Sequence, residues 1–210
     1  IIADESEDGS NEEEAKEESK KDDRELISEF VEEFIFYEGL LKSYQDPENG
    51  NTYLELSDED ISKEFIYFAH IINGTVEAGL FKGSHIDQAV IKFEKQFNSL
   101  NLVRVNTEYY FDPDSELSRQ SQSNISDSVI ENFEITHKNE DENTYLIDIT
   151  KLLKSDNLTK LKSEPRDYES DSFGVGSLSR SKTAISKIYN YPNNTDSVSY
   201  THLRAHETQR

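Results

Sequence analysis

The spacing of apolar residues predicts a short helix before a long β-rich region. Near the start, apolar residues recur every three or four positions, which is typical of one helix face. They are Leu26, Ile27, Phe30, Val31 and Phe34. Asp22 or Asp23 stands just before them and is a residue type that caps helices. We expect this helix to be a packing element of the fold.

From Phe36 onward the apolar period becomes two, which is typical of β-strands. The predicted strands, in chain order, cover residues 37–44, 52–56, 63–72, 76–80, 89–97, 103–111, 133–137, 145–149 and 185–191. The segment 63–72 is apolar on both faces, which indicates a central strand covered on two sides. The segment 89–97, with Phe97 at its end, alternates with polar residues and is predicted to be half exposed.

Turn signals separate these strands. Asp46–Asn51 is rich in turn formers, and Asn73-Gly74 is the strongest two-residue hairpin signal. Ser57–Asp60 has the form of a capping box for one helical turn. The loop Lys138–Asn143 is expected to join a hairpin, and the polar residues 155–181 to form a long surface loop. Together these features predict a mainly β (α+β) fold, a sequential antiparallel meander of seven or eight strands, as a sheet or a sandwich-like domain with a few short helices. No βαβ rhythm is present, which argues against a doubly wound nucleotide fold.

Both ends of the chain differ from this pattern. Residues 1–23 are rich in acids and poor in bulky apolar residues, so we expect a disordered acidic linker. Residues 198–210 resemble the translation of a DNA-sequencing adapter, and we expect them to be a non-native tail. Since position 1 is Ile and no Met is present, Ile1 is expected to be internal to a longer gene. The predicted domain is therefore 24–197, truncated at its C-terminal end.

The amino-acid composition excludes several classes of partner and site. The net charge of −22 argues against nucleic acid as a partner, because phosphate binding needs a basic surface. The absence of Cys excludes disulfides, thiolate zinc sites and Cys nucleophiles. No stretch is long and apolar enough to predict a transmembrane segment. Hydrophobic residues make up only 33% of the chain, but eleven Tyr and eleven Phe can still form a core.

Candidate chemistry is sparse. Outside the tail the histidines are His70, His85 and His137, and no two of them have the short spacing of a ligand set. In the tail, His202 and His206 are four residues apart, but Glu207 follows the second His, whereas a zincin needs Glu beside the first.

Two further motifs are incomplete. Asp112–Glu116 begins like a calcium loop but lacks its Gly and final Glu, so a turn before a helix is expected. Gly174–Ser177 with Lys182 does not complete a phosphate loop and is read as a flexible loop. We predict no catalytic, cofactor-binding or metal-binding residue in this chain.

Seven ordered segments resemble the N-terminal region of a family of bacterial zinc-dependent metalloproteases of the metzincin type. These segments carry the resemblance across 36–197: Phe36–Leu40 with Tyr44–Asp46, Lys63–Phe68, Gly74 with Ala78-Gly79, Phe81 and Gly83, Tyr109–Asp112 with Leu117-Ser118, Asn124–Ser126, Gly176 to Thr183, and Asn190–Asp196. In that family the region is a domain of unknown function.

The resemblance implies a catalytic domain further along the parent protein. There an H-E-x-x-H-x-x-G-x-x-H helix would bind zinc, and its Glu would act as general base. None of those residues is in this chain, so the chain itself is expected to hold no cofactor and to be non-catalytic. The implied partners are the chain's own downstream catalytic domain and a peptide or protein substrate. The implied location is periplasmic, outer-membrane-associated or secreted. The alternative is a stand-alone β-rich binding or structural module of the cell envelope.

Overall fold

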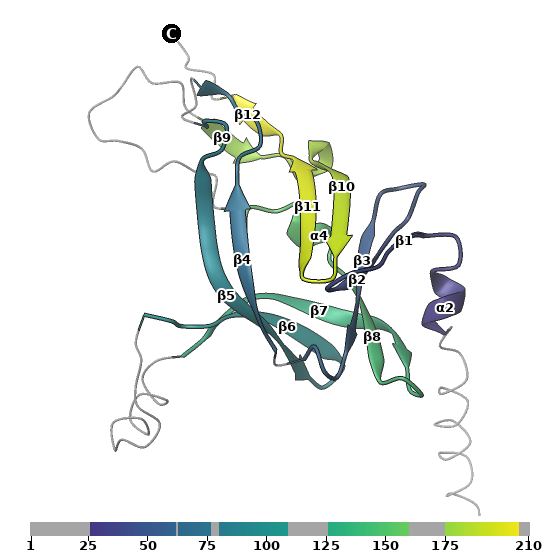
Figure 1. Cartoon of the computed structure of the whole chain (residues 1–210). Helices are drawn as coiled ribbons and strands as arrows, with labels where there is room; N and C mark the ends of the chain where they lie inside the picture. The colour runs from purple at the N-terminus through teal and green to yellow at the C-terminus, as the bar shows by residue number, and fades with distance from the viewer. Residues whose placement is uncertain (1–25, 62, 77–79, 109–125, 160–174, 206–210) are drawn as a thin grey trace, which may run out of the picture.

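The structure, a computed structural model, describes residues 26–61, 63–76, 80–108, 126–159 and 175–205. Its main element is a curled eight-stranded antiparallel sheet in the order β1-β2-β3-β8-β7-β6-β5-β4 (Figure 1). The strands are β1 (Ile35–Tyr37), β2 (Lys42–Gln45), β3 (Thr52–Ser57), β4 (Glu64–His70), β5 (His85–Gln96), β6 (Ser99–Arg104), β7 (Ser128–Asn139) and β8 (Thr144–Asp148). The predicted mainly β class and the antiparallel pairing are confirmed.

The strand order is not wholly sequential. β1–β3 form one meander and β4–β8 a second, and the sheet is continuous because β3 pairs with β8. In this pairing Leu54 lies opposite Ile147 and Leu56 opposite Tyr145. The two meanders therefore share one core.

That core lies inside the curl of the sheet. Its buried residues come from β3, β5, β6, β7 and β8 and from the short helix α4 (Thr150–Leu153): Leu54, Leu56, Phe93, Leu100, Leu102, Phe133, Ile135, Tyr145, Ile147 and Leu152. Side chains alternate across a strand, so every second residue of β3 and β8 reaches this core. Full burial of one such Leu or Ile contributes about 1.5–3 kcal/mol.

The opposite face of β3 and β8 is covered by α2 (Ile27–Phe30). Ile27 and Val31 pack there on Leu146, which is completely buried. The ring of Phe30 contacts Tyr53 edge-on, with the ring centroids 5.3 Å apart. The helix is a packing element, as predicted, but it is shorter than predicted. Its N-cap is Leu26 with no side-chain cap, and Asp22 and Asp23 lie outside the described residues.

A hairpin of β10 (Ala184–Tyr191) and β11 (Asn194–Tyr200) lies next to the loop between β1 and β2. Asn190 holds it there: its Nδ2 donates to the carbonyl oxygens of Tyr37 (2.8 Å) and Leu41 (2.6 Å). The Thr195 hydroxyl donates to Oδ1 of Asn190 at 2.6 Å. Gly39 is required at this contact, because an added Cβ would lie 2.1 Å from that Oδ1 atom.

A second small pair forms next to this hairpin. β9 (Val175–Leu178) pairs with β12 (Leu203–Ala205), and the 3-10 turn η2 (Arg180–Lys182) connects β9 to β10 (Figure 1). The predicted strand 185–191 is confirmed as β10. The prediction of a flexible loop at Gly174–Ser177 is wrong for Val175–Ser177, which belong to β9 because Leu203–Ala205 supply a partner strand.

The prediction of one strand over 37–44 is wrong. The chain turns between β1 and β2, where Leu40 N donates to Tyr191 O at 2.7 Å. The capping-box residues Ser57 and Asp60 do bond to each other, at 3.1 Å from Ser57 N and 2.7 Å from Ser57 Oγ to Asp60 Oδ2. They form a turn and not a helix.

The prediction that 63–72 is a central strand is also wrong. β4 is the last strand of the sheet, and its apolar residues Ile66 and Phe68 are 74% and 58% exposed. Asn73-Gly74 does not form a two-residue hairpin, since the connection continues to β5 at His85. Val76 and Leu80 are not in a strand, and Ala78 lies outside the described residues.

The β5–β6 and β7–β8 hairpins follow the predicted pattern, with two differences. Phe97 does not continue β5 but lies in the turn to β6, with a φ of 53° and 93% exposure. β6 ends at Arg104, so Val105 and Thr107 are not in a strand, while residues 109–111 lie outside the described part of the chain.

The contact between Gly39 and Asn190 predicts a coupled effect on stability. Gly39→Ala should lower the free energy of unfolding by about 1–3 kcal/mol, because the new methyl group overlaps the side chain of Asn190. In the Asn190→Ala background the same change should cost less, since that overlap is removed. Urea unfolding of the two single variants and the double variant measures the coupling. Glu38→Ala is the neighbouring control, and additive effects would contradict the contact.

The turn at Phe97 predicts a stabilising change. Gln96 pairs with Ser99, so Phe97 and Asn98 form a two-residue loop, and φ is positive at Phe97 alone. Such a turn favours Gly at its first position. Phe97→Gly should therefore raise the free energy of unfolding by about 1 kcal/mol, measured by urea unfolding. Asn98→Gly is the control within the same turn and should lower it; the reverse order of the two variants would refute the turn assignment.

Candidate functional site

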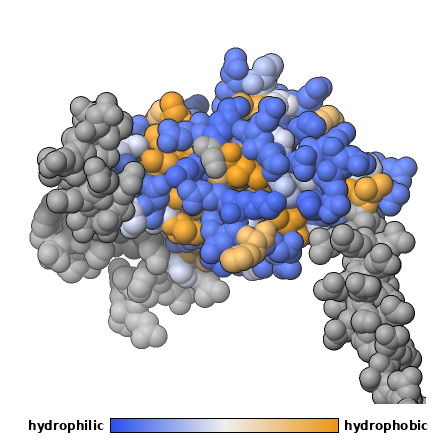
Figure 2. Space-filling model, turned by 90° about the horizontal axis from the view of Figure 1, so that it is seen from below, coloured by the Kyte–Doolittle hydropathy of each residue, from blue (hydrophilic) through white to orange (hydrophobic). Residues whose placement is uncertain are grey.

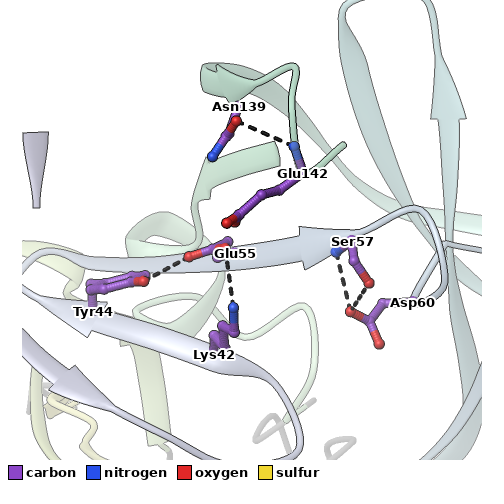
Figure 3. A network of polar contacts seen from close by, with 7 residues as sticks. All are labelled: Lys42, Tyr44, Glu55, Ser57, Asp60, Asn139 and Glu142. Carbon is purple, nitrogen blue, oxygen red and sulfur yellow. Dashed lines mark hydrogen bonds and ion pairs between the residues drawn. The ribbon is translucent and has the colours of Figure 1, made fainter. Parts of the chain in front are cut away.

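A buried carboxylate lies in a cluster of polar side chains (Figure 3). Glu55 on β3 is only 7% exposed, and its Oε2 accepts a hydrogen bond from Tyr44 Oη at 2.6 Å. Lys42 Nζ lies 3.5 Å from Oε1 of the same carboxylate. Glu142, in the turn between β7 and β8, extends toward Glu55 in the figure.

The register explains why these residues meet. Lys42 on β2 pairs with Glu55, and Glu55 pairs in turn with Leu146 on β8. Side chains at paired positions share a face of the sheet. This is the face on which α2 packs, and its helix residues help to bury the neighbouring tyrosines.

The electrostatics of the cluster favour a structural role over an acid–base one. Burial raises the pKa of Tyr44 above its ordinary range, and the hydrogen bond to Glu55 and the charges of Glu55 and Glu142 act in the same direction. Tyr44 is therefore a hydrogen-bond donor that keeps its proton, and not a base or a nucleophile.

Three other sets of polar contacts lie within the described residues. Tyr67 Oη donates to Leu158 O at 2.8 Å, and burial raises the pKa of Tyr67 to about 12, with the nearby Asp87 acting in the same direction. Asp87 itself forms an ion pair with Arg104. On the outer surface, hydrogen bonding to Glu94 and then to Asp127 raises the pKa of Lys92. Each of these groups has a partner, so none is poised for chemistry.

A different feature is suited to binding. We call it the β4 surface, and it consists of exposed apolar residues on β4 and the connection after it: Ile66, Phe68, Ile72, Val76 and Phe81, all 53% to 74% exposed. Ile66 and Phe68 lie on one face of β4, while Phe65, Tyr67 and Ala69 point to the inside of the sheet. Within the described part of the chain, only β5 pairs with β4.

One face of the molecule is mostly hydrophilic. In Figure 2, which views the molecule from below, hydrophilic residues cover most of the surface and interrupt the hydrophobic ones. A row of exposed Ile and Phe on an edge strand is a candidate contact surface.

Two of the three histidines that precede residue 198 pair at the end of the β4 surface. His70 is the last residue of β4 and pairs with His85, the first residue of β5. His137 lies elsewhere, on β7, with its ring stacked on Phe30 at 4.1 Å between centroids. Because fifteen positions separate His70 from His85 in the sequence, their spacing did not indicate that they pair. No sequence signal gave the hairpin register that creates it.

The remaining candidates of the sequence analysis take part in the fold or lie outside the described residues. His202 N donates to Thr183 Oγ1 at 3.2 Å, and its carbonyl oxygen accepts from Ser179 N at 2.8 Å. His206, Glu207, residues 112–116 and the linker 1–23 lie outside the described residues. Among the residues that the structure describes, no group of three or more His, Asp or Glu side chains could hold a metal ion.

The fold and its surface define a mainly β domain with a curled antiparallel sheet and an exposed apolar edge strand. The family model described as "Domain of unknown function (DUF5117)" matches residues 83–209, and the chain belongs to this family. No curated protein and no solved structure matches the chain. The matched range includes most of 198–210, and the assignment of those residues to a non-native tail stays a prediction. No helix among the described residues is long and apolar enough to span a membrane.

The half-buried tyrosines Tyr44 and Tyr67 predict a loss of stability at alkaline pH. Tyrosine in the unfolded chain loses its proton near about pH 10. Folded Tyr44 and Tyr67 keep theirs to higher pH, so above about pH 10 the folded state binds more protons than the unfolded state. The free energy of unfolding should therefore fall as the pH rises from about 10 toward about 12.

Urea unfolding at a series of pH values measures this slope. Tyr44→Phe and Tyr67→Phe should each make it shallower, and Tyr191→Phe, which removes a tyrosine that is 54% exposed, is the control. Equal slopes in the unmodified protein and the three variants would show that Tyr44 and Tyr67 do not cause the loss of stability at alkaline pH.

Proposed function

We propose that this chain is the non-catalytic N-terminal domain of a larger, exported zinc-dependent metalloprotease and contacts the downstream catalytic domain through the β4 surface. The observation that carries the proposal is the exposure of Ile66 and Phe68 on an edge strand. Burying exposed apolar area contributes about 25 cal/mol per Å², so such residues favour association with another surface.

The resemblance to metzincin-type metalloproteases indicates which class of domain the partner belongs to. Two of the resembling segments, Phe36–Leu40 and Asn190–Asp196, lie next to each other in the structure through Gly39 and Asn190. Residues far apart in the sequence thus form one contact, which supports a resemblance that extends over a whole folded unit. A metzincin-type domain would follow this unit in the parent protein.

In this proposal the chemistry belongs to the downstream domain. A zinc ion held there by three His would activate a water molecule for attack on a peptide bond. The present chain would support that domain or shape its substrate cleft. An exported parent would place the domain in the periplasm, at the outer membrane or outside the cell.

A stand-alone binding or structural module of the cell envelope is the second candidate. It is favoured by a second set of exposed aromatic side chains, Tyr189 and Tyr191, which are 43% and 54% exposed on β10. They lie on the face of the hairpin opposite the buried Ile188.

The two candidates make different predictions for the complete gene product. If this chain precedes a protease domain, the reading frame should continue into an H-E-x-x-H-x-x-G-x-x-H helix, and the whole protein should cleave casein in a chelator-sensitive manner. Ile66→Lys with Phe68→Lys should lower the yield of active protein, because both charges would disrupt the contact. Val129→Lys is the control, since Val129 is also 58% exposed but lies on β7. A reading frame that lacks the helix would instead favour the binding module.

A further inference from the structure

The paired histidines of β4 and β5 are placed side by side by an irregularity in the sheet. Along the hairpin the register runs regularly to Ala69, which lies opposite Asp87. Without a change, His70 would then lie opposite Ile86. The register shifts between Ala69 and His70, and the residue opposite His70 becomes His85. Such bulges re-aim side chains and recur next to functional sites.

The hydrogen bonds beyond the pair indicate a close approach. Ile71 N donates to Ser84 O at 2.9 Å, and Gly83 N donates to Ile71 O at 2.6 Å. Because hydrogen-bonded and non-hydrogen-bonded positions alternate in antiparallel pairs, the adjacent His70 and His85 occupy a non-hydrogen-bonded position. The Cα atoms at such a position are about 4.5 Å apart, and the side chains lie closer together than at the other kind.

Both imidazoles are on the outside of the hairpin. His70 is on the exposed face of β4 with Phe68, and the ring of His85 contacts Phe68 edge-on at 6.4 Å between centroids. Both side chains are exposed. They can therefore rotate toward a shared ligand without moving the core.

We propose that His70 and His85 chelate one divalent transition-metal ion of the class that prefers imidazole, namely Cu²⁺, Ni²⁺ or Zn²⁺. Two nitrogen ligands leave further coordination positions open to water or to a donor group of another molecule. The carboxylate of Asp87 lies opposite the buried Ala69 and is paired with Arg104, so the donors at this site are imidazole nitrogens, which disfavours Ca²⁺ and Mg²⁺. The net charge of −22 favours cations at the surface in general. The proposal is independent of the protease assignment.

The test uses the whole chain with His202→Gln and His206→Gln, which removes the two tail histidines. Substitution is better than deletion, because β11 extends to Tyr200 and β12 pairs with β9. Calorimetric titration with CuCl₂ should give one tight site per chain. His70→Gln or His85→Gln should each weaken binding by roughly tenfold or more, since loss of even an outer-shell partner costs that much. Electron paramagnetic resonance should show two imidazole nitrogens on Cu²⁺ in the parent and one in each variant.

His137→Phe is the matched control, because it removes a histidine and keeps an aromatic ring against Phe30. Copper binding in this control should equal that of the parent. The proposal is overturned if the His70→Gln and His85→Gln variants bind Cu²⁺ as the parent does, or if CaCl₂ competes at equal concentration. Circular dichroism melts check that both variants stay folded, as expected for exposed side chains.

Discussion

The pairing of β3 with β8 is the constraint on which the rest of the structure depends. It joins two meanders whose contacting residues, such as Leu56 and Tyr145, are far apart in the sequence. Closing a chain segment of this length costs entropy, which the burial of Leu54, Leu56, Tyr145 and Ile147 offsets. The same pairing puts Leu146 under α2, so β8 is covered on both faces. β8, and not the segment 63–72, is the central strand of the fold.

The β5–β6 and β7–β8 hairpins could be predicted from the sequence, whereas the order of the strands could not. The hairpin of β7 and β8 follows from alternation on either side of a polar loop, a signal contained in twenty residues or so. The segment around Ile66 and Phe68 has the composition of a central strand, because an apolar pattern does not state whether a partner strand is present. Only the β3–β8 pairing assigns β4 to the edge. The segment that was wrongly predicted to be a central strand therefore provides the exposed β4 surface.

The candidate sites lay beyond sequence reasoning for a similar reason. Glu55 is one of 44 acidic residues, and its burial results from pairing with Lys42 and from Tyr44 beside it. His70 and His85 become neighbours through a one-residue shift in the register between β4 and β5. The residue types and their spacing do not indicate such a register shift. The turn at Phe97 shows the same limit, since a bulky residue with positive φ is contrary to the usual turn preferences.

The structure also bears on the extent of the folding unit. The family model begins at residue 83, just before β5, so β1–β4 precede the matched range. Without β3, β8 would be an open edge, and its buried residues would lose half of their neighbours in the sheet. The hairpin of β10 and β11 would likewise lose the carbonyl groups of Tyr37 and Leu41 that Asn190 binds. Residues 83–209 therefore do not carry a complete set of partners for their own strands, which favours a folding unit that begins no later than α2.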